Sequence, residues 1–334
     1  MNFYENKHVL VAGGTGTIGI EIVKQLLLKG CKITVVSLDS KEYFYQIFGE
    51  KTPVNFVQAD LREFVNCYLI TKDVDYIFDM TGIKGSIGSN EGTLHKRFVS
   101  YLRFQANLMD AAYKNSVKRY LYAGSICSYP AASTPKAESL MWEGLPLQND
   151  KYAGIAKRVG EAQAMTYIED GVWDAVRIVR FPNVYGPNDD FNPATAQVIP
   201  ALIARIEAGE NPLKVWGDGS QIRDFLYVDD AAFWSIKALE VLPPGLPTNL
   251  GGVHVYSIRH IVEELCRIYP DLKVEFDPSK QSGDPIRVLD NSRAKQIMDS
   301  TELNTLNTAL RSTIKWYREN RNIAAMKGKF YEGK

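Results

Sequence analysis

A glycine-rich turn near the start of the chain has the residue types and spacing that bind a pyrophosphate. The turn reads Gly13-Gly14-Thr15-Gly16-Thr17-Ile18-Gly19; an apolar run at residues 9–12 precedes it, and apolar residues recur at helical spacing up to Leu27. A strand–turn–helix of this kind turns backbone N–H groups and the positive end of the helix dipole toward phosphate oxygens. We therefore expect a dinucleotide to be bound by Gly13, Thr15, Gly16, Thr17, Ile18 and Gly19.

Two acidic residues follow the next two predicted strands. Asp39 comes shortly after a β-branched run at residues 32–37, where a carboxylate can accept hydrogen bonds from the adenine ribose and repel a 2′-phosphate. This position, and the absence of arginine between Ser37 and Lys41, favours NAD over NADP. The alternative is that Ser37 occupies the strand end and Asp39 caps the next turn. Asp60, with Leu61, either binds the adenine edge or caps a helix.

The elements that position these residues alternate in type along the first half of the chain. Short apolar runs are separated by helical patterns up to about residue 185, which predicts an α/β fold with a doubly wound parallel (Rossmann) sheet. The pattern is less regular afterwards. We expect a dinucleotide-binding domain at 1–185, which segments such as 223–245 rejoin, and a smaller mixed α/β lobe at 186–330.

Composition and charge exclude several classes of protein. The 334 residues carry 39 Lys+Arg against 39 Asp+Glu, so we expect no sequence-independent binding to nucleic acid and no membrane partner. The four cysteines contain no Cys-x-x-Cys pair, which argues against a metal site or a disulfide framework. The chain begins without an apolar signal region, and no apolar run approaches the ~18 residues of a membrane span. We expect a soluble protein of the reducing cytoplasm.

Several further motifs, taken in order, resemble those of the extended short-chain dehydrogenase/reductase family, in its nucleotide-sugar epimerase, dehydratase and reductase branch. The likeness covers nearly the whole chain and rests on the glycine turn, Asp60-Leu61, Gly124-Ser125 and residues 155–161, 182–187, 216–219, 223–225 and 283–287. Residues 124–130 and 188–193 are most similar to GDP-fucose synthases and GDP-mannose 3,5-epimerases.

This resemblance implies hydride exchange between a nicotinamide and C4 of a sugar linked to a nucleotide, most simply GDP. It implies that Ser125 hydrogen-bonds the 4-oxygen and that Lys157 holds the nicotinamide ribose, with Gly82 and Pro182 also at the cofactor. It places Asn183, Gln197, Arg223 and Arg287 in the substrate pocket, where the arginines would neutralise the diphosphate. The alternative for each arginine is a surface ion pair.

The resemblance also implies a homodimer formed through two helices of each subunit, at residues 94–114 and 154–168. The alternative is that the apolar positions of these helices face the sheet.

The tyrosine that serves as general base in this family departs from the expected spacing. The family places it four residues before the lysine, because i and i+4 share a helix face and the ammonium lowers the phenol pKa. Here Tyr152 lies five residues before Lys157, and Ala153 occupies the i−4 position. A regular helix then separates the two side chains by about 140° instead of about 40°. Three interpretations follow: a π-bulge that restores Tyr152, a different base, or an inactivated variant.

Two further departures concern other reactions of the family. Cys127 matches the cysteine of the fucose-synthase acid/base pair, but its histidine is replaced by Gln197, whose amide cannot donate a proton; 3,5-epimerisation is therefore expected to be lost. Cys127 would then be either catalytic or only a packed thiol. Ile126 and Cys127 follow Ser125 where 4,6-dehydratases carry Asp-Glu, so we expect no dehydration.

The sequence thus favours an NAD-dependent oxidoreductase at C4 of a nucleotide-sugar, oxidising the 4-hydroxyl to a ketone. A 4-epimerase or a fucose-synthase-like epimerase-reductase is the alternative. The alanine at position 153 motivates a third possibility, a cofactor-binding protein with impaired catalysis.

Overall fold

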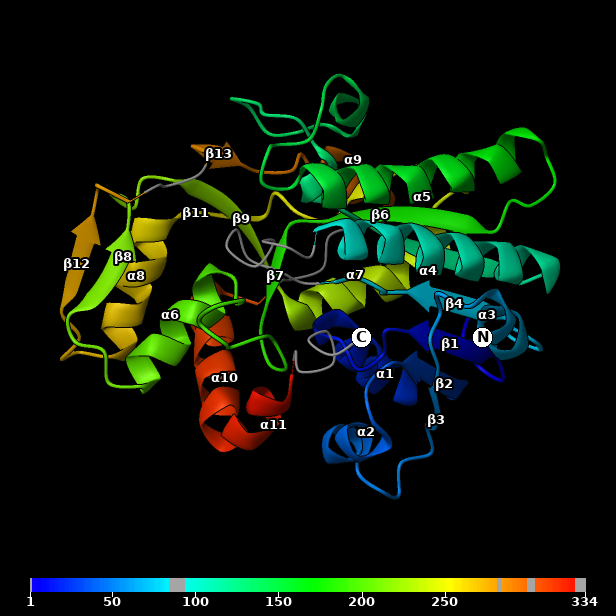
Figure 1. Ribbon diagram of the computed structural model, residues 1–334, viewed down its shortest axis with the longest axis horizontal. Helices are drawn as coiled ribbons and strands as arrows, with labels where there is room; N and C mark the ends of the chain where they lie inside the picture. The colour runs from blue at the N-terminus through cyan, green and yellow to red at the C-terminus, as the bar shows by residue number, and fades with distance from the viewer. Residues whose placement is uncertain (1, 84–93, 281–283, 299–303, 328–334) are drawn as a thin grey trace.

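The computed structural model describes residues 2–83, 94–280, 284–298 and 304–327, and its main feature is a parallel sheet covered by helices on both faces (Figure 1). Within these residues the sheet has seven strands in the order β10-β6-β5-β4-β1-β2-β3. The strands are β1 (His8–Ala12), β2 (Lys32–Ser37), β3 (Asn55–Gln58), β4 (Tyr76–Asp79), β5 (Arg119–Ser125), β6 (Val176–Phe181) and β10 (Thr248–Asn249). All of their pairings are parallel, which confirms the predicted doubly wound sheet.

Each face of this sheet packs against its own group of helices. Helices α1 (Thr17–Leu27) and α7 (Val228–Val241) pack together on one face; α3 (Phe64–Ile70), α4 (Leu94–Lys114) and α5 (Lys151–Glu169) cover the other. Helix α2 is Lys41–Phe48. Strand β1 contributes to a hydrophobic core on each face of the sheet. Val9 and Val11 belong to one buried cluster, and Leu10 and Ala12 belong to the other. Alternating side chains of a strand point to opposite faces, so a strand buried on both faces reads as a continuous apolar run.

A smaller part of the molecule is built from later segments of the chain. A four-stranded sheet contains β7 (Asn183–Tyr185), β9 (Ile222–Tyr227), β11 (His254–Ser257) and β13 (Ile286–Arg287), and a second sheet pairs β8 (Leu213–Trp216) with β12 (Val274–Asp277). The accompanying helices are α6 (Val198–Glu207), α8 (Ile258–Ile268), α9 (Ser292–Met298), α10 (Leu306–Glu319) and α11 (Arg321–Met326). The segment at residues 223–245, which was expected to rejoin the first domain, is divided between the two parts. Strand β9 lies in the smaller sheet, and helix α7 packs on the main sheet.

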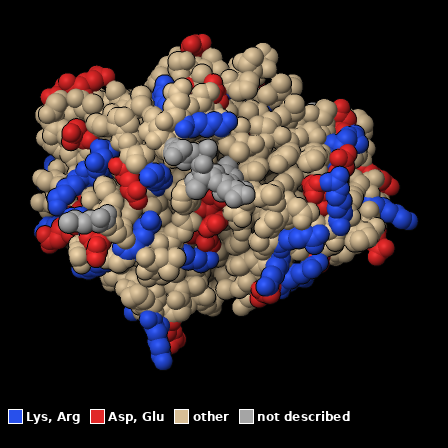
Figure 2. Space-filling view, turned by 180° about the vertical axis from the view of Figure 1, so that it is seen from behind, with Lys and Arg blue, Asp and Glu red and all other residues tan. Residues whose placement is uncertain are grey.

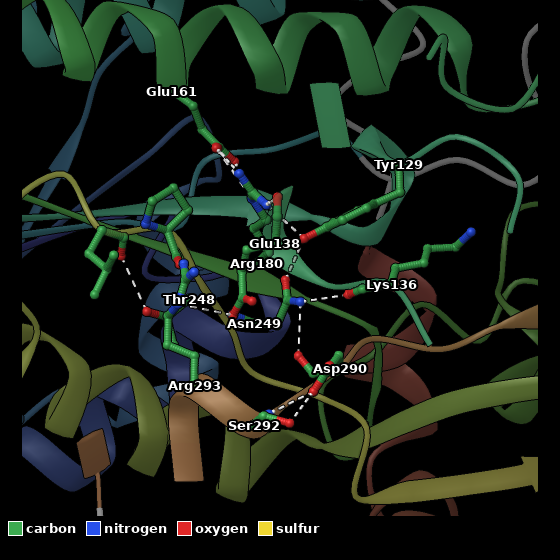
Figure 3. A network of polar contacts seen from close by, with 12 residues as sticks. Tyr129, Lys136, Glu138, Glu161, Arg180, Thr248, Asn249, Asp290, Ser292 and Arg293 are labelled. Carbon is green, nitrogen blue, oxygen red and sulfur yellow. Dashed lines mark hydrogen bonds and ion pairs between the residues drawn. The ribbon is translucent and has the colours of Figure 1, made fainter. Parts of the chain in front are cut away.

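A buried polar network ties the main sheet to the later segments (Figure 3). Glu161 of α5 and Arg180 of β6 form an ion pair of 2.7 Å in which both side chains are almost fully buried. Arg180 also donates to the Tyr129 hydroxyl, which in turn donates to Asn249 of β10. Gly124 makes room for the pair, since a Cβ there would lie 2.8 Å from Glu161 Oε1. The network therefore supports the end of β5, where Ser125 stands.

The surface seen from behind mixes charges of both signs. Figure 2 shows Lys and Arg interspersed with Asp and Glu, without a continuous patch of one sign on that face. Among the described residues, no helix has the length and apolar character needed to cross a bilayer, and no group of three or more His, Cys, Asp and Glu is placed to hold a metal ion.

Candidate active site

The predicted cofactor residues lie at one edge of the main sheet because each follows the carboxyl end of a parallel strand. The glycine turn follows β1, Asp39 follows β2, Gly82 follows β4 and Ser125 ends β5. Parallel strands bring these ends together, and ligands of open α/β sheets bind there.

The glycine turn is shaped as a phosphate cradle. Gly13 has a φ of +71°, and a Cβ there would meet Met80 O at 2.8 Å. A Cβ at Gly19 would lie 2.3 Å from Gly13 O, so this glycine lets α1 approach the turn. Gly16 is the N-cap of α1 and makes no side-chain cap hydrogen bond, and a helix N-terminus of this kind offers backbone N–H groups to an anion. These residues fit a bound pyrophosphate.

Asp39 faces the glycine turn. Its carboxylate accepts hydrogen bonds from Thr15 Oγ1 and, at 3.0 Å, from Ser37 Oγ. Helix α2 is capped instead by Ser40, which accepts from Tyr43 N. Ser37 is the last residue of β2, as the alternative expected, but the Asp39 side chain lies beside the cradle and does not cap α2.

Asp60 and Leu61 lie near this edge but make contacts of their own. The Asp60 carboxylate accepts hydrogen bonds from the backbone N–H of Arg62 at 2.9 Å and from its guanidinium, with Nη2 at 2.6 Å from Oδ2. The N-cap of α3 is Glu63, so Asp60 is not a helix cap. Leu61 is buried in the core.

Lys157 is buried beneath the sheet edge. Its Nζ donates to Thr81 O at 3.1 Å, next to Gly82, and lies over the rings of Tyr101 and Tyr122. Burial lowers the pKa of Lys157, while the charges of Asp79, Glu161 and Cys127 oppose that effect. The ammonium is thus held at the carboxyl end of β4, beside Thr81 and Gly82.

Tyr152 is not brought to this cluster by any contact that the structure describes. Helix α5 is an uninterrupted α-helix, so the π-bulge that would realign Tyr152 is absent from it. The Tyr152 ring is 41% exposed and packs edge-on against Phe98 at 5.9 Å. Ala153 is exposed at the i−4 position and presents only a methyl group.

Cys127 lies in a polar cluster beside Ser125. It belongs to the short 3-10 helix η2 (Ile126–Ser128), and its N–H donates to Ser125 Oγ at 3.1 Å. Arg287 Nη2 donates to Cys127 Sγ at 3.4 Å and lies 2.7 Å from Asp150 Oδ2. Helix α5 packs closely here, because a Cβ at Gly154 would lie 2.2 Å from Cys127 O.

Asp150 belongs to this cluster but was not predicted from the sequence. It is the N-cap of α5, but its side chain makes no cap bond and pairs with Arg287 instead. The missing cap bond is visible only in three dimensions, so the sequence offered no signal beyond an acid before a helix.

Arg223 and Arg287 are neighbours in parallel strands β9 and β13. Arg223 Nη1 donates to Asp284 O at 2.7 Å. Burial and the charge of Arg287 lower the pKa of Arg223 to about 10. Two adjacent guanidinium groups of this kind attract a diphosphate. Arg287 pairs with Asp150, and both side chains are partly buried, so this ion pair differs from the exposed surface pair that was the alternative.

The remaining expected substrate residues lie around β7 and α6. Asn183 Nδ2 donates to Asp224 O at 2.9 Å. Pro182 joins β6 to β7, and Gly251 lies against it. Gln197 is the exposed N-cap of α6, without a side-chain cap bond.

Comparisons with known proteins agree with this geometry. Residues 9–251 match the NAD dependent epimerase/dehydratase family. The GDP-L-fucose synthase of Escherichia coli (strain K12) is 30% identical over 333 residues, covering 95% of this chain and 98% of that protein. A dTDP-4-dehydro-6-deoxy-D-allose reductase of a Streptomyces species is 27% identical and covers 94% of this chain and 97% of that protein. The structure of the UDP-N-acetylglucosamine 4-epimerase from Methanobrevibacter ruminantium M1 has a TM-score of 0.83 at 25% identity, covering 94% and 99%.

The fold and the site define an enzyme built on a dinucleotide-binding sheet. The chain belongs to the NAD dependent epimerase/dehydratase family, whose members include nucleotide-sugar epimerases, dehydratases and reductases. The expected resemblance is thereby confirmed.

Proposed function

We propose that this protein catalyses NAD-dependent hydride transfer at C4 of a nucleoside-diphosphate sugar and favours oxidation to the 4-keto sugar. The observation that carries the proposal is the arrangement of Ser125 and buried Lys157 at the same sheet edge as the glycine cradle. Arg223 and Arg287 are neighbours on β9 and β13, and Arg287 contacts Cys127, two residues from Ser125.

The cofactor would be held by the first part of the chain, residues 1–185. Gly13 to Gly19 would receive the pyrophosphate, and Asp39, with Thr15, would receive the ribose hydroxyls. A carboxylate at that position repels a 2′-phosphate, which supports NAD over NADP. When bound, the nicotinamide accepts or donates the hydride; Lys157 would hold its ribose.

The substrate would lie between the sheet edge and residues 186–330. Arg223 and Arg287 would bind the diphosphate, and Asn183 and Gln197 would line the pocket. Similarity to the GDP-L-fucose synthase of E. coli supports GDP as the nucleotide. Neither 4,6-dehydration nor 3,5-epimerisation is included, since Ile126 and Cys127 follow Ser125 and Gln197 offers only an amide.

The test is an assay of the purified protein with GDP-, UDP- and dTDP-linked sugars and their 4-keto forms, each with NAD(H) and NADP(H). We expect a change in nicotinamide absorbance with GDP-sugars and NAD, and no deuterium at C3 or C5 when the reaction runs in deuterated water. Cofactor binding without turnover on any sugar would refute the proposal and favour the catalytically impaired protein.

A nucleotide-sugar 4-epimerase is the second candidate. It uses the same residues, because the hydride removed from C4 is returned to the other face without an additional acid and base. The fold similarity to a UDP-N-acetylglucosamine 4-epimerase favours it. Conversion of a sugar to its C4 epimer with no net change in NADH would identify this activity.

We further propose that the enzyme is a homodimer of the cytoplasm. Helices α4 and α5 pack side by side on the outside of the sheet, and both expose apolar side chains, Val99 at 45% and Val159 at 43%. All four cysteines are free, which suits a reducing compartment.

A further inference from the structure

Interconversion of a C4 alcohol and a C4 ketone by hydride transfer to or from a nicotinamide requires a group that moves the hydroxyl proton. Ala153 has no such group, and Tyr152 packs against Phe98. The proton must therefore be moved by another side chain that reaches the oxygen held by Ser125.

The tyrosines around Lys157 are committed to other partners. The Tyr101 hydroxyl is hydrogen-bonded to both the N–H and the carbonyl of Ile83. The Tyr122 hydroxyl donates to Gln105 Oε1 and to Lys157 O, and burial raises its pKa far above the ordinary value. Neither phenol is free to reach a substrate.

Cys127 stands among the groups that a catalytic acid requires here. Arg287 Nη2 donates to its thiol at 3.4 Å, and its own backbone N–H donates to Ser125 Oγ at 3.1 Å. Ser125 and Arg287 both lower the pKa of the thiol, which burial raises. A serine hydroxyl and a lysine ammonium are the two groups that accompany the tyrosine in the family arrangement. Cys127 thus lies next to this serine, and its charge is among the causes that raise the pKa of Lys157.

Arg287 couples this thiol to Asp150. One nitrogen, Nη2, lies 3.4 Å from Cys127 Sγ and 2.7 Å from Asp150 Oδ2. Burial and then the charge of Asp150 raise the pKa of the Cys127 thiol, whereas Arg287 and Ser125 lower it. The guanidinium can stabilise a thiolate that forms during turnover, and Asp150 limits how much thiolate exists at rest.

We propose that Cys127 is the acid and base for the oxygen at C4, and that Asp150, acting through Arg287, is a positioning residue for its thiol. This inference rests on the proposed function. In oxidation, the O–H bond breaks and its proton joins the Cys127 thiolate as the C4 hydride leaves with its electron pair for the oxidised nicotinamide. In reduction, the S–H bond breaks and its proton joins the oxygen as C4 receives the hydride; the thiolate stays paired with Arg287 until water reprotonates it.

The first test measures the thiol and needs no turnover. In a Cys31→Ser/Cys266→Ser background, the rate of iodoacetamide alkylation at Cys127 is followed by peptide mass spectrometry across pH 6–10. Cys67 remains, but it is buried and burial raises its pKa to about 12. We expect D150N to speed alkylation at pH 8 about tenfold, because an opposing charge is gone, and R287Q to slow it about tenfold. If the alkylation rates of the background protein, D150N and R287Q had the same dependence on pH, the coupling of Asp150 and Arg287 to the Cys127 thiol would be overturned.

The second test separates Cys127 from Tyr152 by activity. We expect C127A to reduce kcat by at least about 100-fold, as loss of a general acid does, with C127S intermediate. Y152F and the matched cysteine control C266S should stay within about twofold of the wild type. A Y152F enzyme that loses activity while C127A keeps it would transfer the role to Tyr152. A wild type without turnover would instead refute the proposed function, and the alkylation curves would still report the thiol.

Discussion

At the scale of single residues, Tyr152 lies five residues before Lys157, one more than the spacing of the family. Ala153 lies at i−4 from Lys157 on a regular helix, and its exposed side chain leaves space for a larger one. A phenol at this position would share the helix face of Lys157, whose ammonium lowers the phenol pKa.

The prediction at this scale is that A153Y restores activity to a C127A enzyme. We expect at least a tenfold gain in kcat over C127A alone, measured with the sugar and cofactor that the wild type uses. A153F is the matched control, since it fills the same space without a hydroxyl. Equal activities of the tyrosine and phenylalanine variants would argue against a vacant base position.

At the scale of elements, a buried carboxyl holds β9 to two other segments. Asp224 is fully buried and accepts from Gly252 N at 2.6 Å and Leu289 N at 3.2 Å. Burial raises its pKa from 3.8 to about 7. The folded protein therefore binds this proton more tightly than the unfolded chain, so the group's contribution to stability is full below pH ~4 and is lost as pH rises to about 7.

An asparagine does not titrate, so D224N should remove the loss of folding stability that Asp224 causes as pH rises. Near pH 4.5 the variant and the wild type should have similar free energies of unfolding. By pH 8 the variant should be the more stable, by up to ~4 kcal/mol. Urea denaturation of both proteins from pH 4.5 to 8 measures the difference. A difference that does not change with pH would show that Asp224 does not titrate in this range.

At the scale of the whole molecule, the Glu161–Arg180 pair joins α5, β6 and the segments that reach Asn249 (Figure 3). We expect E161Q to destabilise the protein by about 3–5 kcal/mol, because Arg180 would keep its buried charge without the carboxylate. Chemical denaturation is the measurement, and E169Q, on the exposed end of α5, is the matched control. Equal losses in the two variants would contradict the structural role of the pair.

The dimer proposal also belongs to this scale. Sedimentation should show a dimer for the wild type and a monomer for V159E, because a carboxylate cannot be buried in an apolar helix interface without a partner. V172E, at another exposed valine beyond the end of α5, should remain dimeric. A monomeric wild type at all concentrations would refute the proposed interface.

The sequence alone determined the strand, glycine turn and helix on the proposed cofactor side of the site. Glycine spacing and apolar periodicity are local properties, so the turn at Gly13 to Gly19 between a strand and a helix could be predicted without the fold. The role of Ser125 came from the family resemblance. Parallel topology then implied that the strand ends meet.

Tertiary structure decided which side chains touch. Asp39 turns to Thr15, Tyr152 turns to Phe98, and Arg287 reaches Cys127 across 160 positions of sequence. Such contacts depend on how helices and loops pack in space, and no periodicity along the chain encodes the distance between residues so far apart. For this reason the sequence could show that Tyr152 lies one residue outside the family spacing, but only the fold could bring Asp150, Arg287 and Cys127 together.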